Sequence, residues 1–305
     1  MKHLCFLSTL LLYAIAAYAQ TSSPVTITPE RSSKGDIVFW ADNRSPIPYT
    51  VTLTFTKLGI TVSASEGVPQ EMVATTGKRR LFSLRPSSEQ QPVTYSYRVR
   101  MRRGDAKVRA DTTFVYLFPL AEGKKVKVIP GYSYSLEKVL EQLKEGDTSR
   151  PQKSPMTGVG FKTTEGDTIV AARRGVVSEV VEQKPTGDQT SDRSKNYVEV
   201  YHPDGTFARY MLLKYDGIFV KEGDEVFPGQ PLGLIGSGTQ AFGSHLRFTV
   251  TLPGENSHRF LPCFYLSSEQ TGQPDLKTGY VVAHPASIIM QEMSKKEKKR
   301  YLEQK

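Results

Sequence analysis

The chain has 305 residues, of which 38% are hydrophobic and 23% are charged, and its formal net charge is +9. This apolar content is enough to bury cores, and the usual size of domains favours two of them, which argues against a disordered chain. The basic residues are spread along the sequence, so a nucleic-acid-binding protein is disfavoured, while the excess of positive charge favours anionic partners.

Residues 1–19 have the pattern of a secretory signal peptide. Lys2 supplies a positive start, residues 6–17 form an apolar stretch too short for a membrane-spanning helix, and Ala17 and Ala19 offer small side chains at a cleavage site. We therefore expect an exported protein, either periplasmic or extracellular, with no transmembrane segment once the signal is removed.

Residues 20–120 predict an all-β domain. Apolar and polar residues alternate over residues 49–56 and again over residues 95–101, which is typical of strands with one buried face. Turn-forming residues separate such stretches at strand-length intervals. The pattern favours an immunoglobulin-like β-sandwich, although the cysteine pair of immunoglobulins is missing. We expect Trp40 to lie in its core.

Residues 121–155 read as a connecting segment. It starts with a short alternating stretch, continues with apolar residues at helical spacing that predict a short helix over 135–145, and ends in a polar loop with two prolines. At the other end of the chain, residues 286–305 predict a basic C-terminal helix, because Ser294 and Glu297 have the spacing of a capping box.

Residues 156–285 predict a second, mainly antiparallel β domain. Residues 165–170 and 222–227 both begin Glu-Gly-Asp and continue with strand-forming residues, so they form an internal repeat of turn and strand. Cys263, the one cysteine that signal removal would leave, is expected to be a buried small hydrophobe and has no partner for an internal disulfide.

Ordered glycine-rich and strand motifs fill residues 166–250. They are Gly166-Asp167-Thr168-Ile169-Val170, Asn196-Tyr197-Val198-Glu199-Val200-Tyr201-His202-Pro203-Asp204-Gly205, Val220-Lys221-Glu222-Gly223-Asp224-Glu225-Val226 and Gly243-Ser244-His245-Leu246-Arg247-Phe248. In this order they resemble the M23 (LytM-type, lysostaphin-like) peptidase domain. The resemblance implies a duplicated-hybrid-motif β fold, whose active members are zinc endopeptidases that cut peptidoglycan cross-bridges.

The three zinc-ligand positions that the resemblance implies have all been changed in this chain. The first two, a His and an Asp four residues later, fall on Met156 and Gly160, and the third falls on Arg247. A thioether is a weak zinc ligand, glycine has no side chain, and a guanidinium stays protonated without a lone pair. A catalytic zinc site needs three protein ligands, so we expect no metal, no other cofactor and no intact catalytic site.

Further site positions follow from the same resemblance. The Tyr-x-His-Leu motif of the family falls on residues 210–213, where Tyr210 is kept and Leu212 replaces the His. The position of the catalytic His in the last motif is occupied by His245. These residues and Arg247 are expected to line a binding groove without a metal. Arg247 would either bind a carboxylate of a ligand or form an internal ion pair with Asp or Glu, and the sequence leaves both open.

The predicted function is therefore a cell-wall-binding or hydrolase-regulating module that has lost peptidase activity. Its expected partners are peptidoglycan or its stem peptides, and a cell-wall hydrolase if the module is regulatory. Two alternatives remain open at this point. One is an active zinc metalloendopeptidase with non-standard ligands, and the other is an envelope assembly protein that uses residues 20–120 as its main interaction surface.

Overall fold

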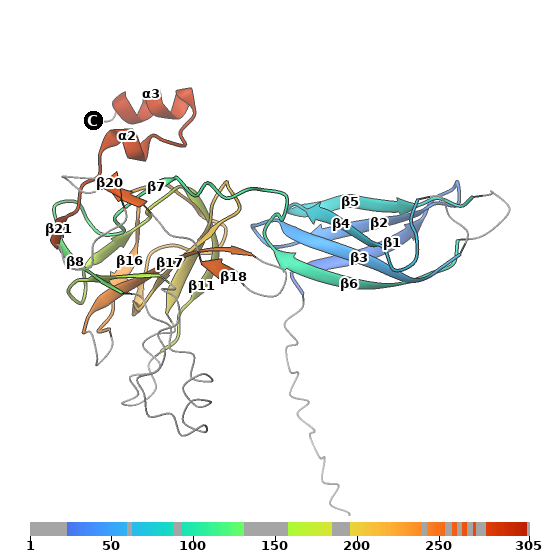
Figure 1. The fold of residues 1–305 in the computed structure, drawn as a ribbon, viewed down its shortest axis with the longest axis horizontal. Helices are drawn as coiled ribbons and strands as arrows, with labels where there is room; N and C mark the ends of the chain where they lie inside the picture. The colour runs from blue at the N-terminus through green and yellow to red at the C-terminus, as the bar shows by residue number, and fades with distance from the viewer. Residues whose placement is uncertain are drawn as a thin grey trace, which may run out of the picture.

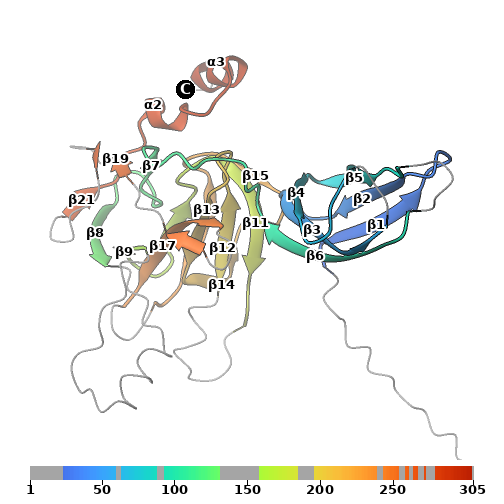
Figure 2. The ribbon, with the colours of Figure 1, turned by 45° about the vertical axis from the view of Figure 1, so that its right-hand side comes forward.

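The structure is a computed structural model, and it describes residues 23–59, 63–87, 93–130, 158–184, 196–238, 243–253, 258–260, 264–266, 271–272 and 279–303. The predicted signal peptide, the helix predicted over 135–145, Met156 and Cys263 lie outside these residues. Within them the chain is mainly β, and two β domains lie side by side (Figures 1 and 2). None of the helices in this part of the chain has the length and apolar content needed to cross a bilayer.

The first domain is a β-sandwich of two antiparallel sheets with the strand orders β1-β2-β5 and β4-β3-β6. We call it the sandwich domain. Its strands are β1 (Val25–Arg31), β2 (Ile37–Asn43), β3 (Tyr49–Leu58), β4 (Pro69–Ala74), β5 (Gly77–Leu84) and β6 (Tyr95–Arg103). The two stretches with period-two alternation form β3 and β6, which pair with each other, so this part of the predicted fold class is confirmed.

An aromatic cluster fills the core of the sandwich domain. Phe39 is fully buried, and its ring centroid lies 5.7 Å from that of Phe55 and 5.2 Å from that of Tyr97. The prediction that Trp40 belongs to this core is wrong. Successive side chains of a strand point to opposite faces, so with Phe39 inside, Trp40 lies on the outer face under the ammonium of Lys78, 5.3 Å from the ring centroid.

The second domain is built on a large sheet whose described strands follow the order β15-β11-β12-β13-β17-β9-β8-β21, with β18 paired to β17. A smaller sheet, β10-β16-β14, packs against one face of it. The strands are β7 (Val115–Leu117), β8 (Lys125–Pro130), β9 (Val159–Lys162), β10 (Thr168–Val170), β11 (Gly175–Val181), β12 (Tyr197–Tyr201), β13 (Phe207–Met211), β14 (Leu213–Ile218), β15 (Glu225–Val226), β16 (Pro231–Ile235), β17 (His245–Pro253), β18 (His258–Phe260), β19 (Phe264–Leu266), β20 (Thr271–Gly272) and β21 (Gly279–Val281).

The strand β8 lies in the segment that we expected to connect the domains, yet it is a full member of the large sheet beside β9. The strand β21, which follows later in the chain, pairs with the other edge of β8. The large sheet is therefore completed by chain segments on both sides of the motif-bearing region. This extension brings Lys125–Pro130 next to the site described below.

The two Glu-Gly-Asp repeats form equivalent turns. Gly166 and Gly223 have φ angles of 84° and 91°, which glycine adopts without the steric cost that other residues incur. The turns lead into β10 and β15, which lie in different sheets. The repeat predicted from the sequence is thus present in the backbone, with one copy beside the small sheet and one beside the large sheet.

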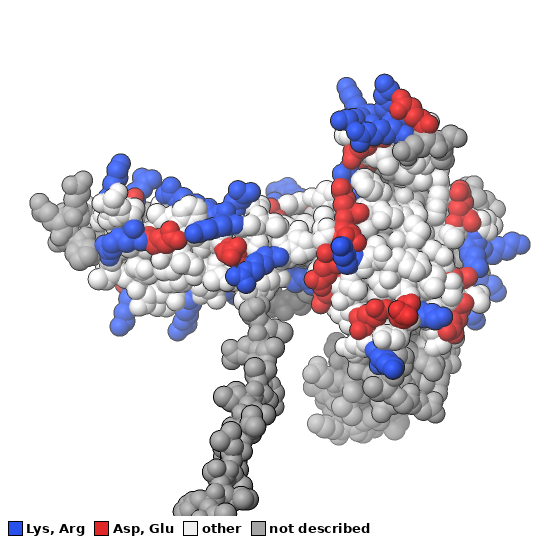
Figure 3. Space-filling model, turned by 180° about the vertical axis from the view of Figure 1, so that it is seen from behind, with Lys and Arg blue, Asp and Glu red and all other residues white. Residues whose placement is uncertain are grey.

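The two domains meet at an ionic cluster centred on Arg103, the last residue of β6. Its guanidinium lies 2.7 Å from Glu199 and 3.1 Å from Glu179, and it stacks over the ring of Phe207 at 5.2 Å. Arg209 approaches Glu199 to 2.6 Å from the other side. Because Glu179 and Glu199 lie directly opposite each other on β11 and β12, the two arginines neutralise a pair of like charges. Figure 3 shows basic side chains spread over the sandwich domain and acidic ones gathered on the second domain next to it.

The C-terminal segment is attached by a second ionic cluster. Its helices are α2 (Ala286–Ile289) and α3 (Lys295–Glu303). The guanidinium of Arg173, almost fully buried, lies 2.7 Å from Glu292 and 2.8 Å from Asp204. The predicted capping box is confirmed, since the amide of Ser294 donates to Glu297 and the amide of Glu297 donates to the Ser294 hydroxyl.

We predict that Arg103→Met destabilises the junction between the domains. Glu199, whose side chain is 4% exposed, would keep Arg209 and the Ser178 hydroxyl but lose one cation, and the loss is expected to be about 2 kcal/mol, the size of a hydrogen bond to a charged group. Denaturant unfolding would measure the change. Arg98→Met on the exposed face of the same strand is the matched control, and an equal loss in both variants would contradict the assignment.

Candidate functional site

Five side-chain positions line up across the face of the large sheet that is turned away from the small sheet. Tyr197 pairs with Met211, Met211 with Arg247, Arg247 with Gly160 and Gly160 with Ile129. Directly opposed residues on neighbouring strands share a face and lie about 5 Å apart. We call this line of residues the Arg247 row. It holds two of the positions at which the M23 resemblance places zinc ligands.

Arg247 lies in the middle of its row, and no acidic side chain among the described residues neutralises its guanidinium. Its Nε atom is buried and has no hydrogen-bond partner, and the described residues provide no ion pair for its guanidinium. Burial lowers the pKa of Arg247. The internal ion pair that the sequence left open is therefore not formed within the described part of the chain. A buried donor without a partner costs free energy, which a ligand that accepts hydrogen bonds would recover.

Gly160 occupies the position of the second expected ligand, and its space is taken by a neighbour. A Cβ atom built on Gly160 would overlap Cγ1 of Ile129, which reaches across from β8. An aspartate at position 160 would have no room in this packing. The space that a side chain at position 160 would need is therefore filled by an apolar side chain from a strand that precedes the motif region.

His245 lies two residues before Arg247 on β17, so its side chain is on the same face of the sheet, and it is buried. Its Nδ1 atom is 2.8 Å from the carbonyl oxygen of Gly243, so Nδ1 carries the proton that is donated in this bond. Burial lowers the pKa of His245, and the charge of Arg247 lowers it further, while the bond to Gly243 opposes both effects. The imidazole is held neutral at a position next to a cation.

Tyr210 and Leu212 contribute to the site differently from what the resemblance implies. Tyr210 is fully buried on the core face of β13, where its hydroxyl accepts a hydrogen bond of 2.8 Å from the amide of Ala172. The Tyr210 side chain therefore packs in the core and does not line the face that carries Arg247. Leu212 is also buried, and its backbone has a φ angle of 73°, which is uncommon for a residue other than glycine.

The described residues do not fit a zinc ion at this site. The ligand positions that can be inspected carry the side-chain-free Gly160 and the cation Arg247, and the described part of the chain contains no cluster of three or more His, Cys, Asp and Glu residues that could hold a metal. A guanidinium repels a divalent cation and has no lone pair for it. We therefore derive no chemistry through a metal.

Two further rows flank the Arg247 row, and of their residues the sequence analysis had assigned a role to His245 alone. On one side lies the ionic cluster of Glu199, Arg209 and Arg103. On the other side His245 pairs with Lys162, and Lys162 pairs with Lys127. The alternation of Lys125 and Lys127 with valines was a signal for an outward-facing basic strand, but nothing in the sequence placed that strand beside the last motif.

Comparison with known proteins identifies the motif-bearing segment. Residues 154–259 match the sequence model of Peptidase family M23. This segment is an M23 domain. No curated protein matches the chain. Strands β8 and β21 lie outside the matched residues, so two strands of the large sheet are additions to the M23 match.

Solved structures of low similarity were also found. The SpoIIQ-SpoIIIAH pore-forming complex is 19% identical with a TM-score of 0.35, and the alignment covers 48% of this chain and 89% of that one. The catalytic domain of lysostaphin from Staphylococcus simulans is 22% identical with a TM-score of 0.30, covering 44% and 87%. Helicobacter pylori Csd3 is 12% identical with a TM-score of 0.32, covering 91% and 83%.

We predict that Gly160→Ala is destabilising because of Ile129. The new methyl group would overlap Ile129, and overpacking of this kind costs about 1–3 kcal/mol. In an Ile129→Ala background the same substitution should cost much less, so a double-mutant cycle of unfolding free energies should show coupling. Gly279→Ala on β21 is the control, because its nearest neighbour would be a carbonyl oxygen at 3.9 Å. Additive costs at 160 and 129 would contradict the packing.

We predict that Arg247→Gln raises the pKa of His245. A neighbouring positive charge disfavours the imidazolium, so its removal moves the pKa upward, while burial still holds it below 6.5. Titration of the His245 ring resonances by NMR measures the change. Arg98→Gln removes a distant charge and should leave the titration as it is. An unchanged midpoint in Arg247→Gln would show that the two groups do not interact.

Proposed function

We propose that the M23 domain is a non-catalytic module that binds peptides through a carboxylate, with stem peptides of peptidoglycan as its ligands. The observation that carries this proposal is Arg247, a cation with a buried and unpartnered Nε in the middle of the row where an M23 peptidase would hold its metal. The M23 match supplies the class of ligand.

The chemistry of Arg247 favours a carboxylate. A guanidinium presents a planar set of donors that matches a carboxylate with two parallel hydrogen bonds, and such charge-assisted bonds are stronger than neutral ones. The row on either side of it offers the partly exposed side chains of Met211 and Ile129, which give apolar contacts to the rest of a peptide. A single cation between apolar neighbours suits one terminal or side-chain carboxylate on an otherwise uncharged peptide.

The neighbouring His245 supports binding rather than hydrolysis. Because the proton on Nδ1 of the neutral imidazole is donated to Gly243, the ring can act toward a bound peptide only as an acceptor at Nε2, and without zinc there is no polarised water for it to assist. The signal-like residues 1–19 and the positive net charge are compatible with an exported protein that meets anionic wall material. Export and a regulatory effect on a hydrolase remain parts of the proposal.

The proposal is tested by binding of two forms of one synthetic stem peptide, one with a free C-terminal carboxylate and one with a C-terminal amide. The full chain should bind the carboxylate form more tightly, and Arg247→Gln should weaken that binding about tenfold, the value of one hydrogen bond to a charged group. Fluorescence anisotropy with a labelled peptide gives both affinities. The amide form should bind both proteins alike.

Arg98→Gln, which removes the same charge from the exposed face of β6, is the matched control and should bind like the unmodified chain. Equal affinities of the two peptide forms for the unmodified chain would overturn the proposal. Metal analysis and peptide cleavage assays separate it from the peptidase alternative. One tightly held Zn²⁺ per chain together with cleavage of the peptide would favour a metalloendopeptidase and sink the binding role.

A further inference from the structure

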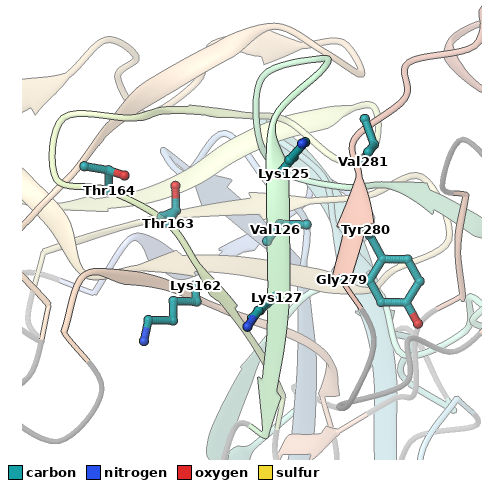
Figure 4. Close-up of a pocket in the computed structure, with 9 residues that line it drawn as sticks. All are labelled: Lys125, Val126, Lys127, Lys162, Thr163, Thr164, Gly279, Tyr280 and Val281. Atoms are coloured by element: carbon teal, nitrogen blue, oxygen red, sulfur yellow. The ribbon is translucent and has the colours of Figure 1, made fainter.

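A second basic site lies at the edge of the large sheet, at the end of the row formed by His245, Lys162 and Lys127. It is an open pocket of about 620 Å³ between β9, β8 and β21 (Figure 4). Lys125, Lys127 and Lys162 stand at its rim, and Thr163 and Thr164 lie on one side of it. Gly279 pairs with Lys127 and presents no side chain there, which leaves the space beside Lys127 open.

The three lysines are an uncompensated concentration of charge. Lys127 and Lys162 are directly opposed on β8 and β9, an arrangement of like charges that destabilises a sheet. None of the described residues that line the pocket is acidic, and the described part of the chain provides no ion pair for these lysines, although the Asp167 carboxylate accepts hydrogen bonds from Thr163 and Thr164 beside them. The neighbouring Lys124 differs, because its ammonium lies 2.6 Å from Asp167. Within the described ranges, the lysine beside the pocket is thus neutralised and the three at the pocket are not.

Most of the residues that line the pocket lie outside the segment that matches the M23 family. Of its lining residues, those on β8 and β21 fall outside residues 154–259, and only the end of β9 and the residues after it lie within the match. The site that the M23 domain shares with its family lies in the Arg247 row. The lysine pocket is therefore a separate feature, created where the added strands meet the domain.

The side chains around the pocket favour a phosphate group as ligand. Lysine ammoniums are compact point charges without the planar fork that selects carboxylates, and several of them can surround the oxygens of a tetrahedral anion. The Thr164 hydroxyl at the side of the pocket can add a hydrogen bond to the same oxygens, whereas the Thr163 hydroxyl already donates to Asp167. We propose that the lysine pocket binds a phosphate-bearing ligand, either a soluble phosphodiester or the phosphodiester of a lipid headgroup.

The experiment compares the full chain with a triple variant, Lys125→Gln, Lys127→Gln and Lys162→Gln. The control is the triple variant Lys184→Gln, Lys214→Gln and Lys221→Gln, which removes the same charge from exposed lysines elsewhere on the M23 domain. The probes are inorganic phosphate, glycerophosphoglycerol, and phosphatidylcholine vesicles with and without phosphatidylglycerol. Binding of the soluble probes is followed by NMR shifts of the protein amides, and binding of the vesicles by co-sedimentation.

Phosphate should shift the amides of β8, of residues 162–164 and of β21, and the pocket variant should bind at least about tenfold more weakly, since each charge-assisted contact contributes on the order of a factor of ten. The control variant should bind like the unmodified chain. Stronger binding of glycerophosphoglycerol than of phosphatidylglycerol vesicles identifies a soluble ligand, and the reverse identifies a lipid. Absence of phosphate binding, or an equal loss in both triple variants, overturns the proposal.

Because the variants of the lysine pocket leave Arg247 in place, the two proposals fail separately. Loss of peptide binding in Arg247→Gln with phosphate binding intact concerns the Arg247 row alone. Circular dichroism of both triple variants verifies that they are folded, and the exposure of all six lysines makes a folding defect an unexpected result.

Discussion

The register of β17 between β13 and β9 is the constraint on which the site depends. It sets Arg247 opposite Met211 on one side and Gly160 on the other, and it sets His245 opposite Lys162. A shift of β17 by one residue would turn His245 and Arg247 into the core and bring Leu246 and Phe248 to the surface, so the buried face fixes the register. The apolar side of the strand thus determines the chemistry of its polar side. This explains how a cation can be held at position 247 at no cost to the pairing of the strands.

Charge changes systematically across the same face. At one end Glu179 and Glu199 are neutralised by Arg209 and by Arg103, and the latter comes from the sandwich domain. At the other end the lysines of β8 and β9 have no counter-charge among the described residues. The acidic end is thus occupied by the protein's own first domain, while the basic end is left for something else. The direction of this gradient agrees with an anionic ligand that approaches from the side of β8, and it gives the sandwich domain a positional role that its fold alone does not suggest.

The sequence predicted the parts of the fold that rest on local patterns. Alternation gave β3 and β6, the Glu-Gly-Asp repeats gave two turns with positive φ angles, and the spacing of Ser294 and Glu297 gave a helix cap. Such local patterns do not predict contacts between segments that are distant in the sequence. Nothing local indicates that Ile129 fills the space beside Gly160, that Arg103 meets Glu199, or that Phe39 rather than Trp40 enters the core. The positions of Gly160 and Arg247 came from a family resemblance, whereas their pairing, and the finding that no residue in the described ranges pairs with Arg247, required the structure.

Leu212 shows why the frame of the site does not need a metal. Its left-handed backbone is held by local bonds, since its amide donates to the carbonyl of Asn196 at 3.1 Å and its carbonyl accepts from the amide of Gly236 at 2.9 Å. Such a conformation costs a residue with a Cβ about 1–2 kcal/mol and persists only where the surroundings determine it. Here two backbone bonds and burial of the side chain do so. The turn that would present a histidine is therefore set by backbone pairing, and an apolar side chain can take the position while the adjacent strands keep their register. A leucine at this position is therefore compatible with the backbone of the turn and with the pairing of the strands around it.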